Sequence, residues 1–211
     1  MTKKERAAKV VEALKKEYPD CACSLVASDP LQLLIATRLS AQCTDARVNL
    51  VTPALFEKYP TIDDYCNAKV EDVEDLIRSC GFFRTKAKDI IGMAQKIKSD
   101  FNSVVPDSIE KLTTLPGVGR KTANLIMGDV YKKPAIVADT HLIRITNLIG
   151  LVETKDPFKV ELGLKKIVEP QESSDFCHRM VMHGRAVCVA RRPKCDVCCV
   201  KEFCKFGSKN A

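Results

Sequence analysis

Residues 115–123 read Leu-Pro-Gly-Val-Gly-Arg-Lys-Thr-Ala, and this stretch determines how the middle of the chain folds. Its Pro suits the first position of a turn and its Gly residues can take a positive φ, so we predict a tight turn between a short helix and a longer one. Where the second helix starts, the backbone amides of Gly119, Arg120 and Lys121 lack intrahelical partners and the helix dipole favours an anion. The turn is therefore predicted to hold a phosphate of a nucleic-acid backbone without reading bases, or else to be an ordinary connector.

The rest of the chain has the pattern of an all-α protein. In residues 4–18, Ala7, Val10 and Leu14 lie on one apolar stripe that stops at Pro19, as in an amphipathic helix. No stretch alternates convincingly between apolar and polar residues as a strand does. We expect about ten helices with short connections, at roughly 4–18, 30–39, 46–58, 70–80, 85–101, a short one capped at 107–108, one from the turn to about 131, 140–148, 157–168 and 174–187.

Composition excludes several classes of protein. The 211 residues are 45% apolar and 29% charged, which suits a packed core and excludes a mainly disordered chain. No apolar run approaches the roughly 20 residues that cross a bilayer, and residues 1–19 lack a signal-peptide core. We therefore expect an intracellular, cytoplasmic protein without membrane contact, associated with the nucleoid in a prokaryote.

The positive charge is concentrated near the C-terminus. Lys and Arg outnumber Asp and Glu by 34 to 27, a formal net charge of +7. Residues 177–211 hold eight basic and two acidic residues, so a segment with a net charge of +6 contains nearly all of the excess. This distribution favours a polyanionic partner.

The cysteines are the second informative feature. Eleven cysteines, an odd number without a secretory signal, argue against a disulfide framework and favour a metal site. Four of them follow the spacing C-x6-C-x2-C-x5-C around a basic loop: Cys188, Cys195, Cys198 and Cys204. Four thiolates select zinc or an iron-sulfur cluster, and the spacing alone leaves both open. We expect the adjacent Cys199 to point away, and the five cysteines of the first half to be small buried residues: Cys21, Cys23, Cys43, Cys66 and Cys80.

Taken together, the turn of residues 115–123, the segments Ser40–Asp45 and Val137–His141, and the four-cysteine spacing resemble the endonuclease III family over nearly the whole chain. The resemblance implies a helix-hairpin-helix DNA-binding motif at about 108–131 and a 4Fe-4S cluster rather than zinc. It also implies two all-α domains with a DNA-binding groove between them: a six-helix barrel-like domain at 22–133, and a cluster domain of 1–21 with 134–211 and a cluster loop at 188–204. The implied partner is damaged double-stranded DNA, bound by a monomer.

The same resemblance assigns the chemistry. Lys121 matches the family's catalytic lysine and Asp139 its catalytic aspartate, which implies a bifunctional DNA glycosylase and AP lyase acting on oxidised pyrimidines such as thymine glycol. The physical case is coherent, because an amine that is desolvated or placed beside a helix N-terminus becomes a nucleophile and Schiff-base former. Asp139 is expected to take up protons or to stabilise positive charge on the sugar, and it also suits a helix cap before Thr140.

Further residues are expected to contact DNA. Gln42 matches the family residue that fills the gap left by a flipped nucleotide, and Phe82 lies where the family has an apolar wedge, although it could equally be a core residue. His141 matches a recurrent positioning residue, whereas His183 is interpreted as structural. The remaining expected contacts are Gly117, Gly119 and Arg120 in the turn and Arg191, Arg192 and Lys194 in the basic loop.

The chain departs from the family's pattern at two positions, and two other functions stay open. Lys121 together with Arg38 argues against the adenine-glycosylase branch, which lacks the lysine and has Glu near position 38. Arg38 is unusual in an apolar helix, and Gly128 is expected to interrupt the helix after the turn. The alternatives are a zinc-binding structural module, and a non-catalytic DNA-structure binder or redox-responsive iron-sulfur module in which Lys121 only contacts phosphate.

Overall fold

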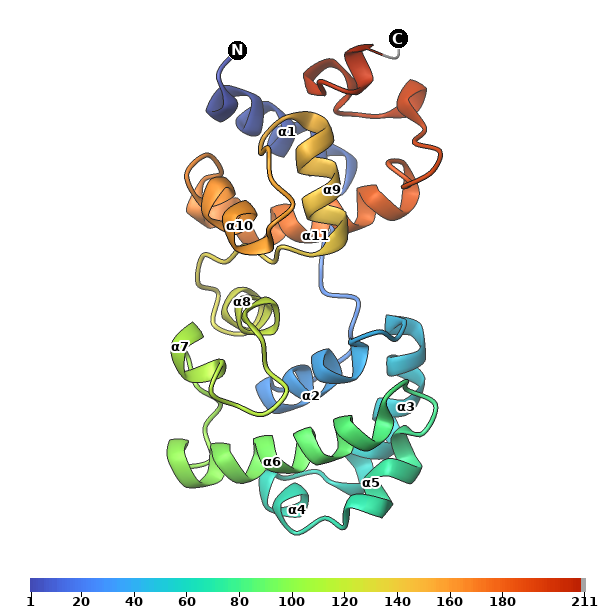
Figure 1. The fold of residues 1–211 in the computed structure, drawn as a ribbon, viewed down its shortest axis with the longest axis vertical. Coiled ribbons are helices and arrows are strands. Elements are labelled where there is room, and N and C mark those ends of the chain that lie inside the picture. Colours follow the sequence, from blue (N-terminus) through green and yellow to red (C-terminus); the bar gives the residue numbers. More distant parts are fainter. Residues whose placement is uncertain (210–211) are drawn as a thin grey trace. The chain divides into compact units, whose positions relative to one another are not determined.

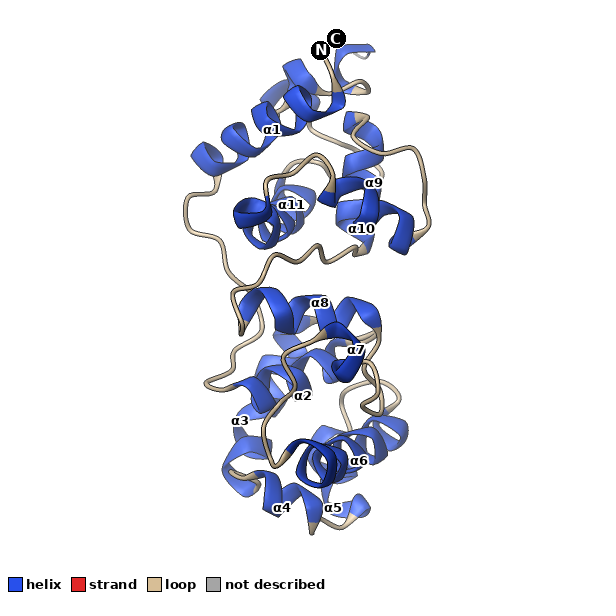
Figure 2. Ribbon diagram, turned by 90° about the vertical axis from the view of Figure 1, so that its left-hand side faces the viewer, coloured by secondary structure: helices blue, strands red, loops and turns tan. Residues whose placement is uncertain are grey.

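The structure, a computed structural model, describes residues 1–209 and contains only helices and loops over that range (Figures 1 and 2). The prediction of an all-α fold is confirmed for these residues. None of their helices combines the length and the hydropathy needed to cross a bilayer. The α-helices are α1 Lys3–Glu17, α2 Pro30–Ser40, α3 Asp45–Lys58, α4 Ile62–Cys66, α5 Val70–Ile77, α6 Phe83–Phe101, α7 Ile109–Leu112, α8 Arg120–Asp129, α9 Thr140–Ile149, α10 Pro157–Lys165 and α11 Ser173–Ala186. The 3₁₀-helices are η1 Pro170–Glu172, η2 Cys195–Val197, η3 Lys201–Phe203 and η4 Gly207–Lys209.

Local sequence signals fix where the helices begin. Asp29 accepts a hydrogen bond from the backbone N–H of Gln32 at 2.9 Å, and Pro30 is the first residue of α2. One short helix, α4, was not predicted from the sequence, because five residues are too few to show a helical period. The interruption expected at Gly128 coincides with the end of α8, since Gly128 is buried in its last turn and the helix ends one residue later, at Asp129.

The chain divides into two compact units, which we describe separately. One unit is continuous and comprises residues 23–131, with helices α2 to α8. The other joins residues 1–22 to the segment that starts at residue 132. The sequence-based boundaries were 22 and 133.

In the unit of residues 23–131, helix α2 lies at the centre. It packs against α3, α6 and α8, and the side chains of Leu34, Ile35 and Leu39 are fully buried. The long helix α6 also packs along α4 and α5 (Figure 1). Because α2 is buried on nearly every side, its sequence is apolar almost throughout, as expected for a central helix.

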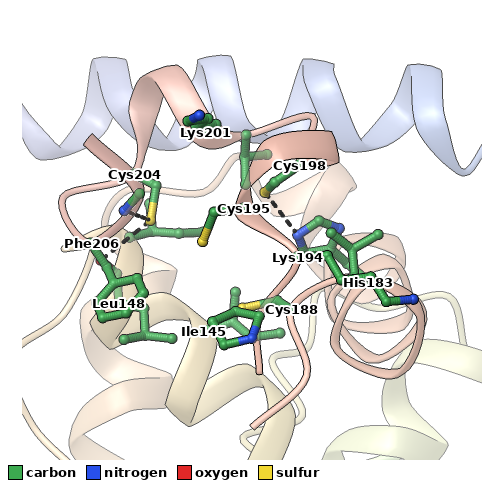
Figure 3. Close-up of a pocket in the computed structure, with 15 residues that line it drawn as sticks. Ile145, Leu148, His183, Cys188, Lys194, Cys195, Cys198, Lys201, Cys204 and Phe206 are labelled. Atoms are coloured by element: carbon green, nitrogen blue, oxygen red, sulfur yellow. Dashed lines mark hydrogen bonds between the residues drawn. The ribbon is translucent and has the colours of Figure 1, made fainter. Parts of the chain in front are cut away.

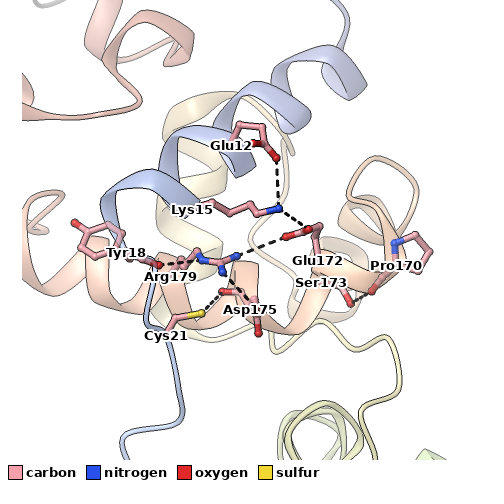
Figure 4. Close-up of polar contacts among 9 residues, drawn as sticks. All are labelled: Glu12, Lys15, Tyr18, Cys21, Pro170, Glu172, Ser173, Asp175 and Arg179. Carbon is pink, nitrogen blue, oxygen red and sulfur yellow. Dashed lines mark hydrogen bonds and ion pairs between the residues drawn. The ribbon is translucent and has the colours of Figure 1, made fainter.

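In the other unit, helix α1 packs against α11 and against η3 near the C-terminus. Figure 4 shows the polar contacts that support this packing: Lys15 Nζ lies 2.8 Å from Glu172 Oε1, and Arg179 donates from Nε to the carbonyl of Tyr18 at 3.2 Å. Arg179, only 5% exposed, also pairs with Asp175 at 3.2 Å. The N-terminal helix is therefore an integral part of the unit that contains the C-terminal cysteines.

Candidate functional site

The turn of residues 113–119 lies between α7 and α8. Leu115 and Val118 are buried and anchor the turn, with a backbone hydrogen bond from Val118 N–H to the Leu115 carbonyl at 3.1 Å. Gly117 has φ +72°, a left-handed conformation that favours glycine. Gly119 is the N-cap of α8 and offers no side-chain cap, so the start of the helix has the bare backbone that an anion site needs.

Lys121 is in the first turn of α8, two residues after the Gly119 cap, and its side chain is exposed. The expected position beside a helix N-terminus is thus present. The expected desolvation is not, because the protein alone leaves this amine in contact with solvent. Arg120, Gly117 and Gly119 are exposed as well, so two cationic side chains and two glycines at this turn are accessible to solvent.

Gln42 and Phe82 are exposed and come together at one pocket. Gln42 follows α2 with φ 53°, and Phe82 immediately precedes α6 with φ 57° and 66% exposure. Both line a pocket of about 420 Å³, a volume that includes space open to solvent. Left-handed conformations at residues other than glycine are strained and cluster at functional sites. The interpretation of Phe82 as a core residue was therefore wrong.

Sequence reasoning missed two residues of this pocket, Thr85 and Lys86. Lys86 is 1% exposed, and its Nζ donates to the carbonyl of Leu39 at 2.7 Å. Burial lowers the pKa of this amine below its ordinary value. A buried lysine in the second turn of a helix has no distinguishing sequence signal, because lysine at that position is normally solvated.

Asp139 and His141 belong to the other unit. Asp139 is half-buried and is the N-cap of α9, where its carboxylate accepts a hydrogen bond from Leu142 N–H at 2.7 Å. His141 lies 3.4 Å from Arg144 Nη2 through its Nδ1. It also packs so closely on α11 that a Cβ added to Gly184 would lie 2.5 Å from the same nitrogen. Asp139 thus fulfils the cap role expected for it, with its carboxylate still partly accessible.

The four cysteines of the C-x6-C-x2-C-x5-C spacing, Cys188, Cys195, Cys198 and Cys204, line one cavity of about 380 Å³, again including space open to solvent (Figure 3). Their thiols are free of disulfides. Aliphatic side chains form part of the lining, among them Ile145, Leu148 and Val200, and the other lining residues include His183, Lys194, Lys201 and Phe206. Cys199 is not among the lining residues, which agrees with the expectation that it points away.

Hydrogen-bond donors surround these sulfur atoms. His183 Nε2 lies 3.4 Å from Cys198 Sγ, and Arg144 donates to Cys188 Sγ at 3.6 Å. His183 is 1% exposed, and burial together with the charge of Arg144 lowers its pKa to about 4. The Oη of Tyr18 lies 3.2 Å from the other ring nitrogen of His183. His183 is therefore more than the structural residue expected from sequence, because it connects Tyr18 to a candidate ligand.

Burial raises the pKa of the Cys188 and Cys198 thiols, and the neighbouring sulfurs raise it further, while Arg144 lowers that of Cys188. Thiolates gathered in such a cavity need a compensating cation. No group of three or more His, Cys, Asp or Glu side chains within residues 1–209 converges in the manner that a single metal ion requires.

The basic loop between Cys188 and Cys195 presents Arg191, Arg192 and Lys194 as exposed side chains. Its ends are joined by the hydrogen bond from Lys194 N–H to the Val187 carbonyl at 3.0 Å. The predicted residues thus fall into two sets. The turn, Lys121, Gln42 and Phe82 belong to residues 23–131, whereas Asp139, His141, the cysteines and the basic loop belong to the other unit.

Comparison with known proteins identifies the family. Residues 35–170 match the HhH-GPD superfamily base excision DNA repair protein. The chain is 45% identical over 204 residues to endonuclease III of Synechocystis sp., covering 96% of this chain and 93% of that protein. It is 40% identical over 193 residues to endonuclease III of Bacillus subtilis, covering 91% and 88%.

Solved structures agree. The structure of a trapped endonuclease III–DNA covalent intermediate, an estranged-adenine complex, matches with a TM-score of 0.93 and 41% identity over 100% of this chain and 99% of that chain. A thermostable thymine-DNA glycosylase at 22% identity and TM-score 0.84 shares the fold. The resemblance expected from sequence is confirmed, and the chain belongs to the HhH-GPD superfamily of base excision DNA repair proteins and, within it, to the endonuclease III family of DNA glycosylases and AP lyases.

Proposed function

We propose that this protein removes oxidised pyrimidines, such as thymine glycol, from duplex DNA and then cleaves the strand at the abasic site through Schiff-base chemistry at Lys121. The observation that carries the proposal is the exposed amine of Lys121 in the first turn of α8, directly after a glycine turn with an uncapped helix start. A phosphate bound at that helix start brings the neighbouring sugar within reach of the amine.

The reaction at Lys121 runs in two stages. The neutral amine attacks C1′ of the damaged nucleotide, the glycosidic bond breaks, and the base leaves with a proton. The sugar ring then opens by cleavage of the C1′–O4′ bond, with a proton passing to O4′, and the nitrogen on C1′ becomes an imine. The imine acidifies C2′, and loss of a C2′ proton breaks the C3′–O3′ bond, so that the 3′ phosphate leaves by β-elimination. Because Lys121 is exposed in the protein alone, we expect the bound DNA to exclude water from the amine.

We propose that Asp139 assists these steps. Its carboxylate already accepts one hydrogen bond at the start of α9, which fixes its orientation. A carboxylate held in this way can take the proton released by the attacking amine and stabilise positive charge on the sugar. Substitution Asp139→Asn keeps the shape of the cap, and we expect it to slow base release by about 10²- to 10⁴-fold, the usual contribution of acid-base catalysis.

We propose that Gln42 and Phe82 enter the duplex where the damaged nucleotide leaves it. An exposed amide beside an exposed aromatic ring, both on strained residues at one pocket, suits this role, because the amide can form hydrogen bonds and the ring can stack on a base. Backbone phosphates would be held by Arg120 and the glycine turn, and by Arg191, Arg192 and Lys194 of the basic loop. His141 would position the start of α9.

We propose that Cys188, Cys195, Cys198 and Cys204 hold a 4Fe-4S cluster. Four free thiols at one cavity, in a chain that belongs to the endonuclease III family, support this assignment, because thiolates are the ligands that iron-sulfur clusters take. When bound, such a cluster supplies a rigid link across residues 188–204, and that link holds the basic loop in place. The loop then loses little conformational entropy on binding DNA.

Borohydride trapping tests the proposal. Purified protein is incubated with duplexes carrying thymine glycol or an abasic site in the presence of borohydride, which reduces the imine to a stable covalent adduct. We expect adducts on both duplexes, and none from Lys121→Gln. The control is Lys111→Gln, which removes another exposed lysine of the same turn region and is expected to trap normally.

The outcomes separate the possibilities. An adduct on the abasic duplex alone would keep Lys121 as the lyase residue and reject the oxidised-pyrimidine substrate. No adduct on either duplex, from protein that still binds DNA, would reject the enzymatic role in favour of a DNA-structure binder.

A further inference from the structure

Two cysteines outside the cluster set flank the residues that we propose enter the duplex. Cys43 directly follows Gln42 in the connection between α2 and α3, and Cys80 lies two residues before Phe82 in the connection between α5 and α6. Neither has a role in the proposed chemistry. Both were expected from sequence to be small buried residues, which is confirmed for Cys80, whereas Cys43 is only half-buried.

The structure brings these thiols together. The side chains of Cys80 and Cys43 interact electrostatically, and both thiols are free. The two loops also touch, since a Cβ added to Gly81 would lie 3.6 Å from the Gln42 carbonyl oxygen. Gln42 and Phe82 line the same pocket. We propose that Cys43 and Cys80 form a reversible disulfide that joins these two loops and lowers the activity of the protein on DNA.

Accessibility sets the order of events. Cys43 is half-buried, whereas Cys80 is fully buried, so an external oxidant reaches Cys43 first. Burial and the neighbouring Cys43 raise the pKa of Cys80 to about 11, whereas the charges of Lys86 and Arg47 act in the opposite direction. Cys80 is therefore the second, resolving thiol, which reacts once Cys43 carries the mixed disulfide.

The oxidant is a low-molecular-weight disulfide of the glutathione class, written RSSR. The Cys43 thiolate attacks one sulfur of RSSR, which breaks its S–S bond, releases RS⁻ and forms a mixed disulfide. The Cys80 thiolate then attacks the Cys43 sulfur and expels the second RS⁻. The two cysteines lose two electrons and two protons in total, and RSSR becomes two RSH. An external thiol reverses both steps.

The bond has a mechanical consequence. A disulfide holds its sulfurs about 2.05 Å apart, closer than two free thiols approach one another, so the two loops must be drawn together. Gln42 and Phe82 are adjacent to the moving segments and already have left-handed backbones. The expected effect of the disulfide on activity rests on the proposed function. Since a misplacement of about 1 Å can reduce a rate by about 10²-fold, we expect oxidation to reduce lesion processing by at least about tenfold.

Peptide mapping tests the bond independently of any activity. The loaded protein is treated with oxidised glutathione, blocked with an alkylating reagent and digested with trypsin. Cleavage after Arg and Lys yields peptides Leu39–Arg47 and Ser79–Arg84, each with a single cysteine. We expect these two peptides to appear joined, lighter by two hydrogen atoms than their sum. Absorbance near about 400 nm is followed throughout to ensure that the cluster cysteines stay engaged.

Matched variants connect the bond to function. Cys43→Ala and, separately, Cys80→Ala remove the cross-link and are expected to make DNA cleavage insensitive to oxidised glutathione. Cys66→Ala removes a half-buried thiol of the same unit and is expected to leave both the cross-link and the sensitivity unchanged. A thiol reductant should restore the activity of oxidised wild-type protein.

Two results would overturn the proposal. One is the absence of the joined peptides at an oxidant concentration that already forms a mixed disulfide on Cys66. The other is a joined peptide without loss of DNA cleavage, which would reject the effect on activity. Reduced protein that is inactive on every duplex would instead contradict the proposed function, and the peptide map would still report on the disulfide.

Discussion

Arg38 and Asp89 form an ion pair directly beside the glycine turn: Arg38 Nη2 lies 2.6 Å from Asp89 Oδ2, and Nε donates to the same oxygen at 2.8 Å. The pair joins α2 to α6, and the two side chains are 15% and 21% exposed. A Cβ added to Gly117 would lie 2.5 Å from Arg38 Nε and 2.9 Å from Asp89 Oδ2. The arginine that seemed misplaced in an apolar helix is thus paired, and it supports the turn that precedes Lys121.

Asp89→Asn should reveal this support. The substitution leaves the guanidinium partly buried without its counter-charge, so we expect the free energy of unfolding to fall by about 2 kcal/mol, between the values for exposed and fully buried pairs. Urea denaturation measures it. Asp75→Asn is the control, because the Asp75–Arg78 pair is exposed and should contribute no more than about 0.5 kcal/mol. Equal losses in the two variants would contradict the role assigned to the Arg38–Asp89 pair.

The two turn glycines should respond differently to alanine. Gly117→Ala places a side chain at φ +72° against Arg38, and we expect it to destabilise the protein by about 1–3 kcal/mol and to weaken DNA binding. Gly119 has no atom within 4 Å of an added Cβ, so Gly119→Ala should change stability by less than about 0.5 kcal/mol.

Because Gly119→Ala should leave stability unchanged, a loss of DNA affinity in this variant would mean that the added methyl group keeps a phosphate away from the backbone amides. We expect a loss of about tenfold, equivalent to one hydrogen bond to a charged group. Binding of a duplex measured by fluorescence anisotropy, alongside thermal unfolding, separates the two effects. Unchanged affinity in Gly119→Ala would place the phosphate elsewhere.

The pattern of the sequence was sufficient for the long helices and for the cysteine set, because both depend on local spacing. Helical periodicity and caps such as Asp29 and Ser108 act within a few residues. The five-residue helix α4 has too little sequence to show a period.

What sequence could not provide were contacts between distant residues. Arg38 meets Asp89 across 51 positions, and the left-handed backbone of Gln42 and Phe82 has no signal in their residue types, because glycine is the usual residue there. The exposure of Lys121 in the protein alone was not predicted either, since solvent access depends on how the surrounding chain packs. The residues of the site could therefore be predicted from motifs, whereas their contacts, backbone conformation and solvent exposure could not.

His183 should tune the proposed cluster through Cys198. If Tyr18 Oη donates to Nδ1, the ring proton is on Nε2 and points to Cys198 Sγ at 3.4 Å. Hydrogen bonds to cluster sulfurs raise the reduction potential. We therefore expect His183→Leu to lower the potential of the loaded protein and to speed iron loss to a chelator, with a smaller effect from Tyr18→Phe.

Potentiometric titration followed by absorbance measures the first effect, and released iron measures the second. His178→Gln is the control, because His178 is on the same helix but does not line the cysteine cavity. A potential unchanged in His183→Leu and equal to that of the control would show that the ring only fills space.

The basic loop should govern the salt dependence of DNA binding. Each cation that neutralises a phosphate contributes about 0.9 to the slope of log affinity against log salt. We expect joint replacement by Gln of Arg191, Arg192 and Lys194 to reduce the slope by about 3 if all three side chains contact phosphate. Binding to every duplex should weaken alike.

The matched control replaces three exposed lysines of the same unit, Lys155, Lys159 and Lys166, and so makes the same change in net charge. Its slope should change little, because charges that do not touch the backbone release no counterions. Equal slopes in the two triple variants would mean that the loop acts only through the overall charge of the protein, and that its position between Cys188 and Cys195 has no part in holding DNA.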